Sequence, residues 1–341
     1  MRTYLLPEKG TFYKANLHCH TTVSDGKWTP EQVKENYRAR GYSIVAYTDH
    51  SVFVTHNELC DTSFLPLNGY EISFRESSDS FLKQKCHICL ISLDPNKKTH
   101  KYVCDGAYLK KNETVVCLDA DKEYITDDYS GDYISNVIKK AANDNFFVTY
   151  NHPIWSMETK DEYRNYYGMH AMEIVNWNCI VEGYNDRNET IYDQMLRDGK
   201  KLYCLATDDN HDAYPIDHPK NDSFGGFTMI KAEKLSYDAV AEALVKGNFY
   251  SSEGPEIKEL YFEDCKVHLT SSEAVRIAMS TECRQYRVVT AETCGETINE
   301  AVFKITPKVG SYVRFSVFDE TGKGAYSNAY DPSDFWSETE L

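Results

Sequence analysis

Short apolar runs alternate with amphipathic segments along the first 255 residues of the chain. The clearest helix is predicted to begin at Thr29-Pro30-Glu31, where Thr29 can cap it and Pro30 suits the first helical position, and to end at Gly41. The apolar runs predict strands over residues 11–17, 42–47, 64–69, 87–93, 146–150, 172–175 and 201–206, and the amphipathic segments predict helices over 30–41, 132–143, 187–198 and 236–247. Strands that alternate with helices favour parallel pairing, so this part predicts an α/β domain.

The pattern changes after Gly254-Pro255. Alternating runs without helical periodicity follow, over residues 259–269, 274–280, 286–291, 301–306 and 312–318. They are typical of a small antiparallel β domain resembling a sandwich. We therefore expect an α/β domain over 1–256 and a β domain over 257–341, with a loose acidic tail from residue 331. The polar, turn-rich stretch 94–130 indicates an insertion into the first domain, with a hairpin around 114–118.

Composition narrows the possible partners. The net charge of −16 and the pI of about 5.1 argue against binding to nucleic acid or to an anionic membrane surface. They do not exclude an anionic small-molecule substrate, because bound metal ions can dominate the local field. The chain has no apolar run long enough to span a membrane and no apolar signal-peptide core at its start, and its eleven cysteines are scattered. We expect a cytoplasmic protein that acts on a small molecule, and the sequence leaves its oligomeric state open.

Candidate metal ligands gather where the predicted strands end. His18 and His20 are two residues apart, so on a strand both imidazoles point to one face and can reach one ion, and Asp25 follows in a short turn. Similar side chains recur at other strand ends, and the complete set is His18, His20, Asp25, His50, Glu71, His87, His152, Asp209 and His211. Ordinary polar capping would explain one or two of these histidines, but six with three carboxylates favour a metal centre.

Mixed nitrogen and oxygen ligands suit zinc, manganese or iron. Because nine ligands exceed the needs of one ion, we expect two or three divalent ions, with Glu71 able to bridge two of them. In a parallel barrel, such strand ends would share one rim. His87 lies at the beginning of its strand, so an antiparallel neighbour or a bulge would be needed to bring it there.

Other polar residues have weaker indications. Asp49 and Asp208 adjoin candidate ligands and could orient their imidazoles, or simply be solvated strand ends. Arg75 could reach a substrate phosphate, or be a solvated charge. Glu173 could touch the metal layer, but we expect it to pack within the barrel. The remaining histidines are expected at the surface; they are His56, His100, His170, His218 and His268. Cys19 is expected to point into the barrel wall.

The order of these blocks resembles the PHP (polymerase and histidinol phosphatase) superfamily. The blocks are His-Cys-His-x4-Asp-Gly at 18–26, Thr-Asp-His at 48–50, Gly-Tyr-Glu at 69–71, Asn-His-Pro at 151–153 and Asp-x-His at 209–211. The resemblance covers residues 13–255 and implies a distorted (β/α)7 barrel with a metal cluster on its rim. It assigns His18, His20, Glu71 and Asp209 to a first ion, Glu71, His87 and His152 to a second, and Asp25, His50 and His211 to a third.

The resemblance leaves three functions open. The first is a phosphoesterase, in which a hydroxide bridging two ions attacks the phosphoryl group and Asp209, His211 or a metal-bound water serves as the general acid. The second is a carbamate, amide or ester hydrolase on the same ions, because residues 247–255 and 312–325 are similar to a subgroup that includes carbaryl hydrolases. The third is a non-catalytic metal-binding protein. A phosphatase should have Arg, Lys or His in its pocket wall, whereas a carbamate site should be apolar and aromatic.

Overall fold

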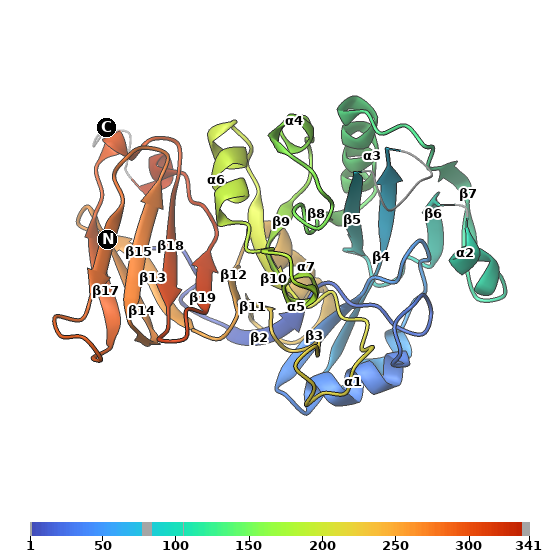
Figure 1. Cartoon of the computed structure of the whole chain (residues 1–341), viewed down its shortest axis with the longest axis horizontal. Helices are drawn as coiled ribbons and strands as arrows, with labels where there is room; N and C mark the ends of the chain where they lie inside the picture. Colours follow the sequence, from blue (N-terminus) through green and yellow to red (C-terminus); the bar gives the residue numbers. More distant parts are fainter. Residues whose placement is uncertain (1, 77–83, 105, 336–341) are drawn as a thin grey trace.

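The computed structural model describes residues 2–76, 84–104 and 106–335, and it has a mixed α/β fold with large sheets (Figure 1). The strands of the largest sheet are β2 (Thr11–Asn16), β3 (Tyr42–Tyr47), β4 (Leu65–Arg75), β5 (Lys85–Ser92), β8 (Phe146–Tyr150), β9 (Ala171–Asn176), β10 (Tyr203–Thr207), β11 (Phe227–Ala232), β12 (Phe249–Ser252), β15 (Arg276–Thr281), β16 (Arg287–Thr290), β18 (Val313–Phe318) and β19 (Gly324–Ser327). Their order is β10-β9-β8-β5-β4-β3-β2-β11-β12-β19-β18-β15-β16.

Helices follow several strands of this sheet. The helices are α1 (Pro30–Arg38), α2 (Ala107–Lys111), α3 (Gly131–Asn143), α4 (Lys160–Tyr163), α5 (Trp177–Glu182), α6 (Glu189–Arg197) and α7 (Tyr237–Lys246), with short 3-10 turns η1 (Asn57–Leu59), η2 (Pro307–Val309) and η3 (Pro332–Phe335). The predicted start of α1 is confirmed, because the Thr29 hydroxyl accepts from the Gln32 backbone and the Gln32 side chain accepts from Thr29. None of the helices in the described ranges is long and apolar enough to cross a membrane.

The sheet is parallel in two blocks separated by one reversed strand. β2, β3 and β4 pair in parallel, as do β8, β9 and β10, but β5 is antiparallel to both β4 and β8. Nine residues separate β4 from β5, too few for a parallel crossover. Because β5 is reversed, its beginning lies at the edge where the parallel strands end. His87, near the start of β5, therefore lies at the same edge as the other candidate ligands.

The hydrogen-bonded order of the sheet is not closed. β10 forms one edge, and the strand after it in sequence, β11, pairs antiparallel with β2. A single parallel bridge, between Cys19 and Asn210, joins the segments that follow β2 and β10. The mixed α/β class is therefore observed, while a closed seven-stranded barrel stays a prediction.

The C-terminal strands continue the large sheet and also build a second one. β19 pairs with β12, and β18, β15 and β16 follow it. The second sheet has four strands in the order β1-β13-β14-β17, formed by β1 (Thr3–Tyr4), β13 (Ile257–Glu263), β14 (Lys266–Ala274) and β17 (Ile298–Lys304). These two sets of strands lie together at one end of the molecule, with the apolar faces between them buried (Figure 1).

One expectation for this region needs correction. The run 259–269 is not one strand but parts of β13 and β14, joined by a turn in which Asp264 and Cys265 have φ of +50° and +58°. The N-terminal strand β1, which was expected in the first domain, pairs with β13 of the C-terminal region. A domain boundary at residue 256 stays a prediction. Of the expected loose tail, residues 332–335 form η3 and residues 336–341 lie outside the described part.

The insertion has a different structure from the expected hairpin. β6 (Thr99–Val103) and β7 (Cys117–Tyr124) pair in parallel, with α2 between them. The prediction of a hairpin around 114–118 is therefore wrong: the connection that contains α2 returns the chain so that β7 runs in the same direction as β6. Figure 1 shows this unit beside β4 and β5 at the far end from the C-terminal sheets.

Two histidines expected at the surface are buried. His56 and His100 are 5% and 0% exposed. The His100 ring lies beside Tyr70, and its Nδ1 accepts from the Phe53 backbone at 3.2 Å. No local pattern indicated this burial, because His100 belongs to the insertion whereas Tyr70 and Phe53, which lie against it, belong to the scaffold. Cys19 is buried among apolar side chains, as expected.

Candidate metal centre

All nine predicted ligands lie together at the edge where the parallel strands end. Six are buried, namely His18, His20, Glu71, His87, His152 and Asp209. Three are partly open to solvent, with side-chain exposures of 34% for Asp25, 21% for His50 and 25% for His211. The site thus has a buried part and a part that faces the exterior.

Glu71 lies at the centre of the buried part. Its Oε1 is 3.1 Å from His87 Nδ1 and 3.3 Å from the Nε2 atoms of both His18 and His152. Its Oε2 is 2.8 Å from His50 Nδ1. Glu71 lies inside β4 because that strand extends to Arg75, beyond the predicted end. One carboxylate therefore contacts imidazoles from four separate segments.

Asp209 forms a second point of convergence. Its Oδ1 is 2.9 Å from His20 Nε2 and 3.1 Å from His18 Nε2. Asp209 and His152 both adopt left-handed backbone conformations, with φ of +53° and +26°. Such conformations are uncommon for residues other than glycine and concentrate at functional sites. The turns after β8 and β10 therefore aim these side chains inward.

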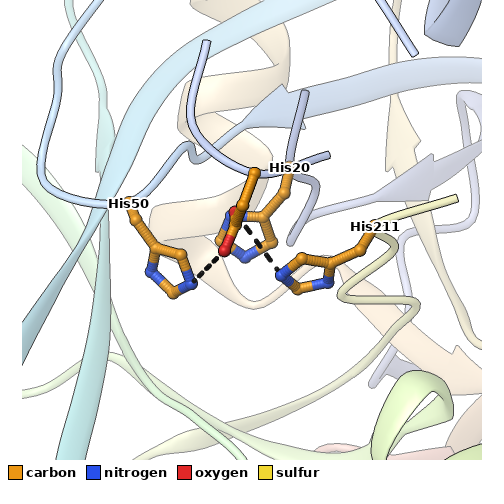
Figure 2. A group of neighbouring side chains, drawn as sticks. His20, His50 and His211 are labelled. Atoms are coloured by element: carbon orange, nitrogen blue, oxygen red, sulfur yellow. Dashed lines mark ion pairs between the residues drawn. The ribbon is translucent and has the colours of Figure 1, made fainter. Parts of the chain in front are cut away.

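The partly open group consists of His20, His50, His211 and Asp25, and Figure 2 shows the three imidazoles turned toward one another. Asp25 Oδ1 is 3.9 Å from His20 Nδ1 and 3.7 Å from His211 Nε2, while Oδ2 is 3.8 Å from His50 Nε2. These separations are longer than hydrogen bonds and leave room between the donor atoms. The ligand atoms of the four residues all lie within 4.8 Å of one another.

Two carboxylate oxygens make the centre suitable for a cation. Asp25 Oδ1 is buried and has no hydrogen-bond partner within the described ranges, while Glu71 Oε2 has His50 Nδ1 beside it at 2.8 Å. A buried carboxylate oxygen without a donor is costly, and a bound cation would remove that cost. Imidazole nitrogens and carboxylate oxygens are the donors that divalent transition metals accept. The residues present therefore fit divalent metal ions.

The buried histidines respond differently to their surroundings. Burial lowers the pKa of His87 to about 4, and burial together with the neighbouring His50 and His211 lowers that of His20 to about 4. For His152 burial also lowers the pKa, but the hydrogen bond with Glu71 and the charge of Asp209 outweigh it and raise the pKa to about 9. Neutral imidazoles are the form that binds a metal, so His20 and His87 are prepared for ions at neutral pH. The pKa values of His18 and His50 are raised, as that of His152 is, because nearby carboxylates outweigh burial, so at these three residues a metal must displace a proton.

The two central carboxylates are held ionised. Burial alone would raise the pKa of Glu71, but the charges of His87 and His18 hold it well below its usual range. The pKa of Asp209 is likewise lowered, because His18 and His20 outweigh the effect of burial. Both groups therefore remain negative over the physiological range and available to a cation.

Glu173 has a larger role than the packing expected from sequence. Its Oε1 accepts from His18 Nδ1 at 2.7 Å and from the Thr207 hydroxyl at 2.7 Å. Its Oε2 accepts from the His152 backbone N–H at 2.8 Å. A carboxylate on the far nitrogen of a ligating imidazole fixes its tautomer and orientation. The signal in the sequence was a charged residue inside an otherwise apolar strand.

Asp49 and Asp208 support turns instead of imidazoles. Asp49 accepts from the backbone N–H groups of Thr21 and Ser24 at 2.8 and 2.9 Å. Asp208 accepts from the backbone N–H groups of Phe224, Gly225 and Gly226. Neither carboxylate contacts an imidazole in the described structure, so the expected orienting role is wrong. Both stabilise the loops that carry the site.

Sequence reasoning missed three neighbours of the carboxylates. Asn151 Nδ2 donates to Glu71 Oε1 at 3.1 Å, and Asn176 Nδ2 donates to Asp209 Oδ2 at 3.1 Å. Cys89 Sγ lies within ligand distance of His18 and Glu71, although burial raises its pKa to about 11 and favours the thiol. Both asparagines directly follow predicted strands, which was the available signal. Cys89 forms a Cys-x-x-Cys with Cys86, but no second pair follows at the spacing of a zinc site.

A cavity of about 980 Å³ opens onto the centre. Its wall includes three cationic residues, Arg75, Lys85 and Lys220, and the aromatic residues Tyr108, Trp155, Tyr184 and Tyr214. Arg75 and Lys85 face each other across the β4–β5 ladder, and neither has an ion-pair partner in the described ranges. Burial and the neighbouring Arg75 lower the pKa of Lys85. Two unneutralised cations on one wall favour an anionic occupant.

Known proteins offer few comparisons at the level of sequence. No family model matches the chain, and no curated protein does so either. Three similar solved structures have TM-scores of 0.45, 0.40 and 0.35.

The first is a two-domain protein from Bacteroides vulgatus containing a predicted PHP-like metal-dependent phosphoesterase; it is 18% identical and covers 95% of this chain and 97% of its own. The second, a proposed metal-dependent phosphoesterase from Bifidobacterium adolescentis, is 18% identical and covers 71% of this chain and 98% of its own. The third, an amidohydrolase from Chromobacterium violaceum with bound sulfate and no metal, is 15% identical and covers 58% and 87%.

Proposed function

We propose that the protein is a metal-dependent hydrolase, and specifically a phosphoesterase, that works on two or three divalent ions. The observation that carries the proposal is the convergence of nine nitrogen and oxygen ligands at the cavity, among them a buried Asp25 oxygen that has no hydrogen-bond partner in the described ranges. Bound ions would lower the pKa of a water molecule to produce a nucleophile and would neutralise phosphoryl oxygens. Zinc, manganese and iron all suit this donor set.

Three groups of side chains would hold the ions. His18, His20 and Asp209 would hold one with help from Glu71, and Glu71 would share the second with His87 and His152. The third would lie among Asp25, His50 and His211. In support of this division, Glu71 Oε1 lies within 3.3 Å of nitrogens from both of the first two groups. His20 and His50 each lie between two groups, which favours a compact cluster over separate sites.

The cavity wall favours a phosphoester over a carbamate or amide. Arg75 and Lys85 would hold the anionic part of the substrate, because a phosphoryl group offers charge for both, whereas a neutral carbamate offers none. Trp155 lies beside them, with Lys85 Nζ 5.1 Å from its ring centroid, and would contact an apolar leaving group. The aromatic share of the wall keeps carbamate, amide or ester hydrolysis as the second candidate.

The proposed reaction also needs a group that gives a proton to the leaving group. Asp209 is enclosed between imidazoles and ionised, which makes it a poor acid. His211 lines the cavity and is partly open to solvent. As a ligand of the third ion, with its Nδ1 2.9 Å from the Asp209 carbonyl oxygen, His211 would have no free proton either, so we propose that a water molecule in the cavity protonates the leaving group.

A substrate panel on metal-loaded protein tests the proposal. Protein reconstituted with zinc or manganese should cleave p-nitrophenyl phosphate or bis-p-nitrophenyl phosphate faster than a 1-naphthyl carboxyl ester or carbamate, and EDTA should abolish the activity. Lys85→Gln should lower kcat/KM for phosphoesters by about 10- to 100-fold, the value of one hydrogen bond to a charged group. Lys246→Gln, an exposed lysine on α7, is the matched control.

The alternatives predict different results from the same panel. Turnover of the naphthyl substrates with no loss on Lys85→Gln would establish the carbamate or ester hydrolase. Bound metal without turnover of any substrate would support the non-catalytic reading.

A further inference from the structure

Helix α2 of the insertion and the residue after it dock on the turn that carries Asp25. Lys111 Nζ donates to the carbonyl oxygens of Thr22 at 2.6 Å and Ser24 at 3.1 Å. Asn112 Nδ2 donates to the carbonyl oxygen of Val23 at 2.8 Å. Two adjacent residues of the insertion thus engage three consecutive carbonyls of a turn that lies 87 to 89 positions earlier in the chain.

The other side of this turn is held by the sheet. Asp49, just after β3, accepts from the backbone N–H groups and the hydroxyl groups of both Thr21 and Ser24, at 2.7 to 2.9 Å. Asp49 therefore satisfies the donors of the turn, while the insertion satisfies its carbonyls. Removing the insertion contacts would leave the turn anchored on one side only.

Tyr108 extends the contact to the metal centre. Its hydroxyl donates to Asp25 Oδ2 at 3.1 Å, and its ring lies nearly parallel to that of His50, with centroids 6.1 Å apart and an interplanar angle of 17°. The other oxygen, Asp25 Oδ1, has no hydrogen-bond partner in the described ranges and faces His20 and His211. A donor on one oxygen fixes the rotation of the carboxylate and leaves the other oxygen free for a cation.

We propose that residues 107–112 of the insertion form a brace that positions Asp25 for the outermost metal ion, with Tyr108 as the positioning residue. This inference rests on the metal centre proposed above. Without the brace, a carboxylate that is 34% exposed on a surface turn would sample several rotamers, and only some of them would face His211 and His20. The insertion thereby makes the outermost ion dependent on a segment that the α/β scaffold does not supply.

Metal titration of two Tyr→Phe variants tests the role of Tyr108. Tyr108→Phe removes the hydroxyl and keeps the ring beside His50, whereas Tyr184→Phe changes another tyrosine of the same cavity wall. We expect Tyr108→Phe to weaken the most weakly held manganese or zinc ion by about tenfold, the value of one hydrogen bond to a carboxylate. The other ions should bind as in the wild type, and Tyr184→Phe should change nothing.

Hydrogen exchange of the metal-free protein tests the docking separately. Lys111→Met removes two contacts to the turn, so the amides of residues 21–26 should exchange about tenfold faster, while those of the strand 146–150 should not change. A wild type that bound no metal would overturn both the proposed function and this inference. A metal-loaded, active wild type in which Tyr108→Phe matched Tyr184→Phe, or unchanged exchange in Lys111→Met, would overturn the brace alone.

Discussion

Replacing the central carboxylate is the sharpest test of how the centre is built. Glu71→Gln keeps the size and shape of the side chain but removes its charge. Imidazole nitrogens of five histidines lie 2.8 to 3.7 Å from the Glu71 oxygens, so this carboxylate is shared by the first two ligand groups and adjoins the third; the histidines are His18, His20, His50, His87 and His152.

The expected loss follows from Coulomb's law. Removing one negative charge about 4 Å from a single positive charge costs about 4 kcal/mol at an effective dielectric constant of about 20, and we take this as the minimum for a divalent ion. That corresponds to a loss of about a thousandfold in affinity for each ion that Glu71 contacts. Asp25→Asn is the matched comparison, because that carboxylate is 34% exposed and belongs to one group. Its better solvation reduces the cost to about 1 kcal/mol, or about fivefold.

Elemental analysis after dialysis against graded zinc or manganese buffers measures the difference. Glu71→Gln should lose two ions at concentrations where the wild type is saturated, whereas Asp25→Asn should keep its ions there and need about fivefold more metal to fill one site. Circular dichroism of both variants checks that the fold is intact. Equal losses in the two variants, or a Glu71→Gln protein with its full complement of metal, would refute the central role of this carboxylate.

Two further predictions concern stability, both measured by urea unfolding. Glu158 is buried among the hydroxyls of Tyr129, Tyr150 and Tyr166, and burial raises its pKa from 4.5 to about 7. Between these two pH values the folded state keeps a proton on Glu158 that the unfolded state has lost, so the free energy of unfolding falls as the pH rises from 4.5 to 7. The free energy of unfolding of Glu158→Gln should therefore rise relative to that of the wild type by up to about 3 kcal/mol between pH 4.5 and 8, and a difference that does not change with pH would contradict this. Arg314 is buried and pairs with Asp193 and Glu189, so Arg314→Met should cost about 3–5 kcal/mol, against little change for the exposed Arg284→Met; equal costs would refute the pairing.

Local pattern was enough to find the ligands. His18, His20 and Asp209 were predicted because metal-binding side chains directly follow apolar runs, and both features are visible in a few consecutive residues. β3 and β8 begin and end where the sequence predicted. Boundaries failed where a turn lies within an alternating run, as between β13 and β14, because the two-residue period continues through a tight turn.

Which strands pair with which could not be predicted from the sequence. The period of a strand indicates which face is buried, but it does not say which other strand lies beside it. The antiparallel setting of β5, the ladder between β2 and β11, and the continuation of the sheet into β19 all depend on such choices. These pairings also decided that Arg75 would face Lys85.

The sequence by itself determined the α/β character of most of the chain, the identities of the nine candidate ligands and the expectation of a metal centre. Tertiary structure alone decided that Glu173 supports His18, that Arg75 and Lys85 form an unneutralised pair, and that Tyr108 holds Asp25. The physical reason is that ligand type and strand period are encoded locally, whereas these contacts join segments tens to more than a hundred residues apart, or depend on which strands pair. Only the folded chain brings such segments together.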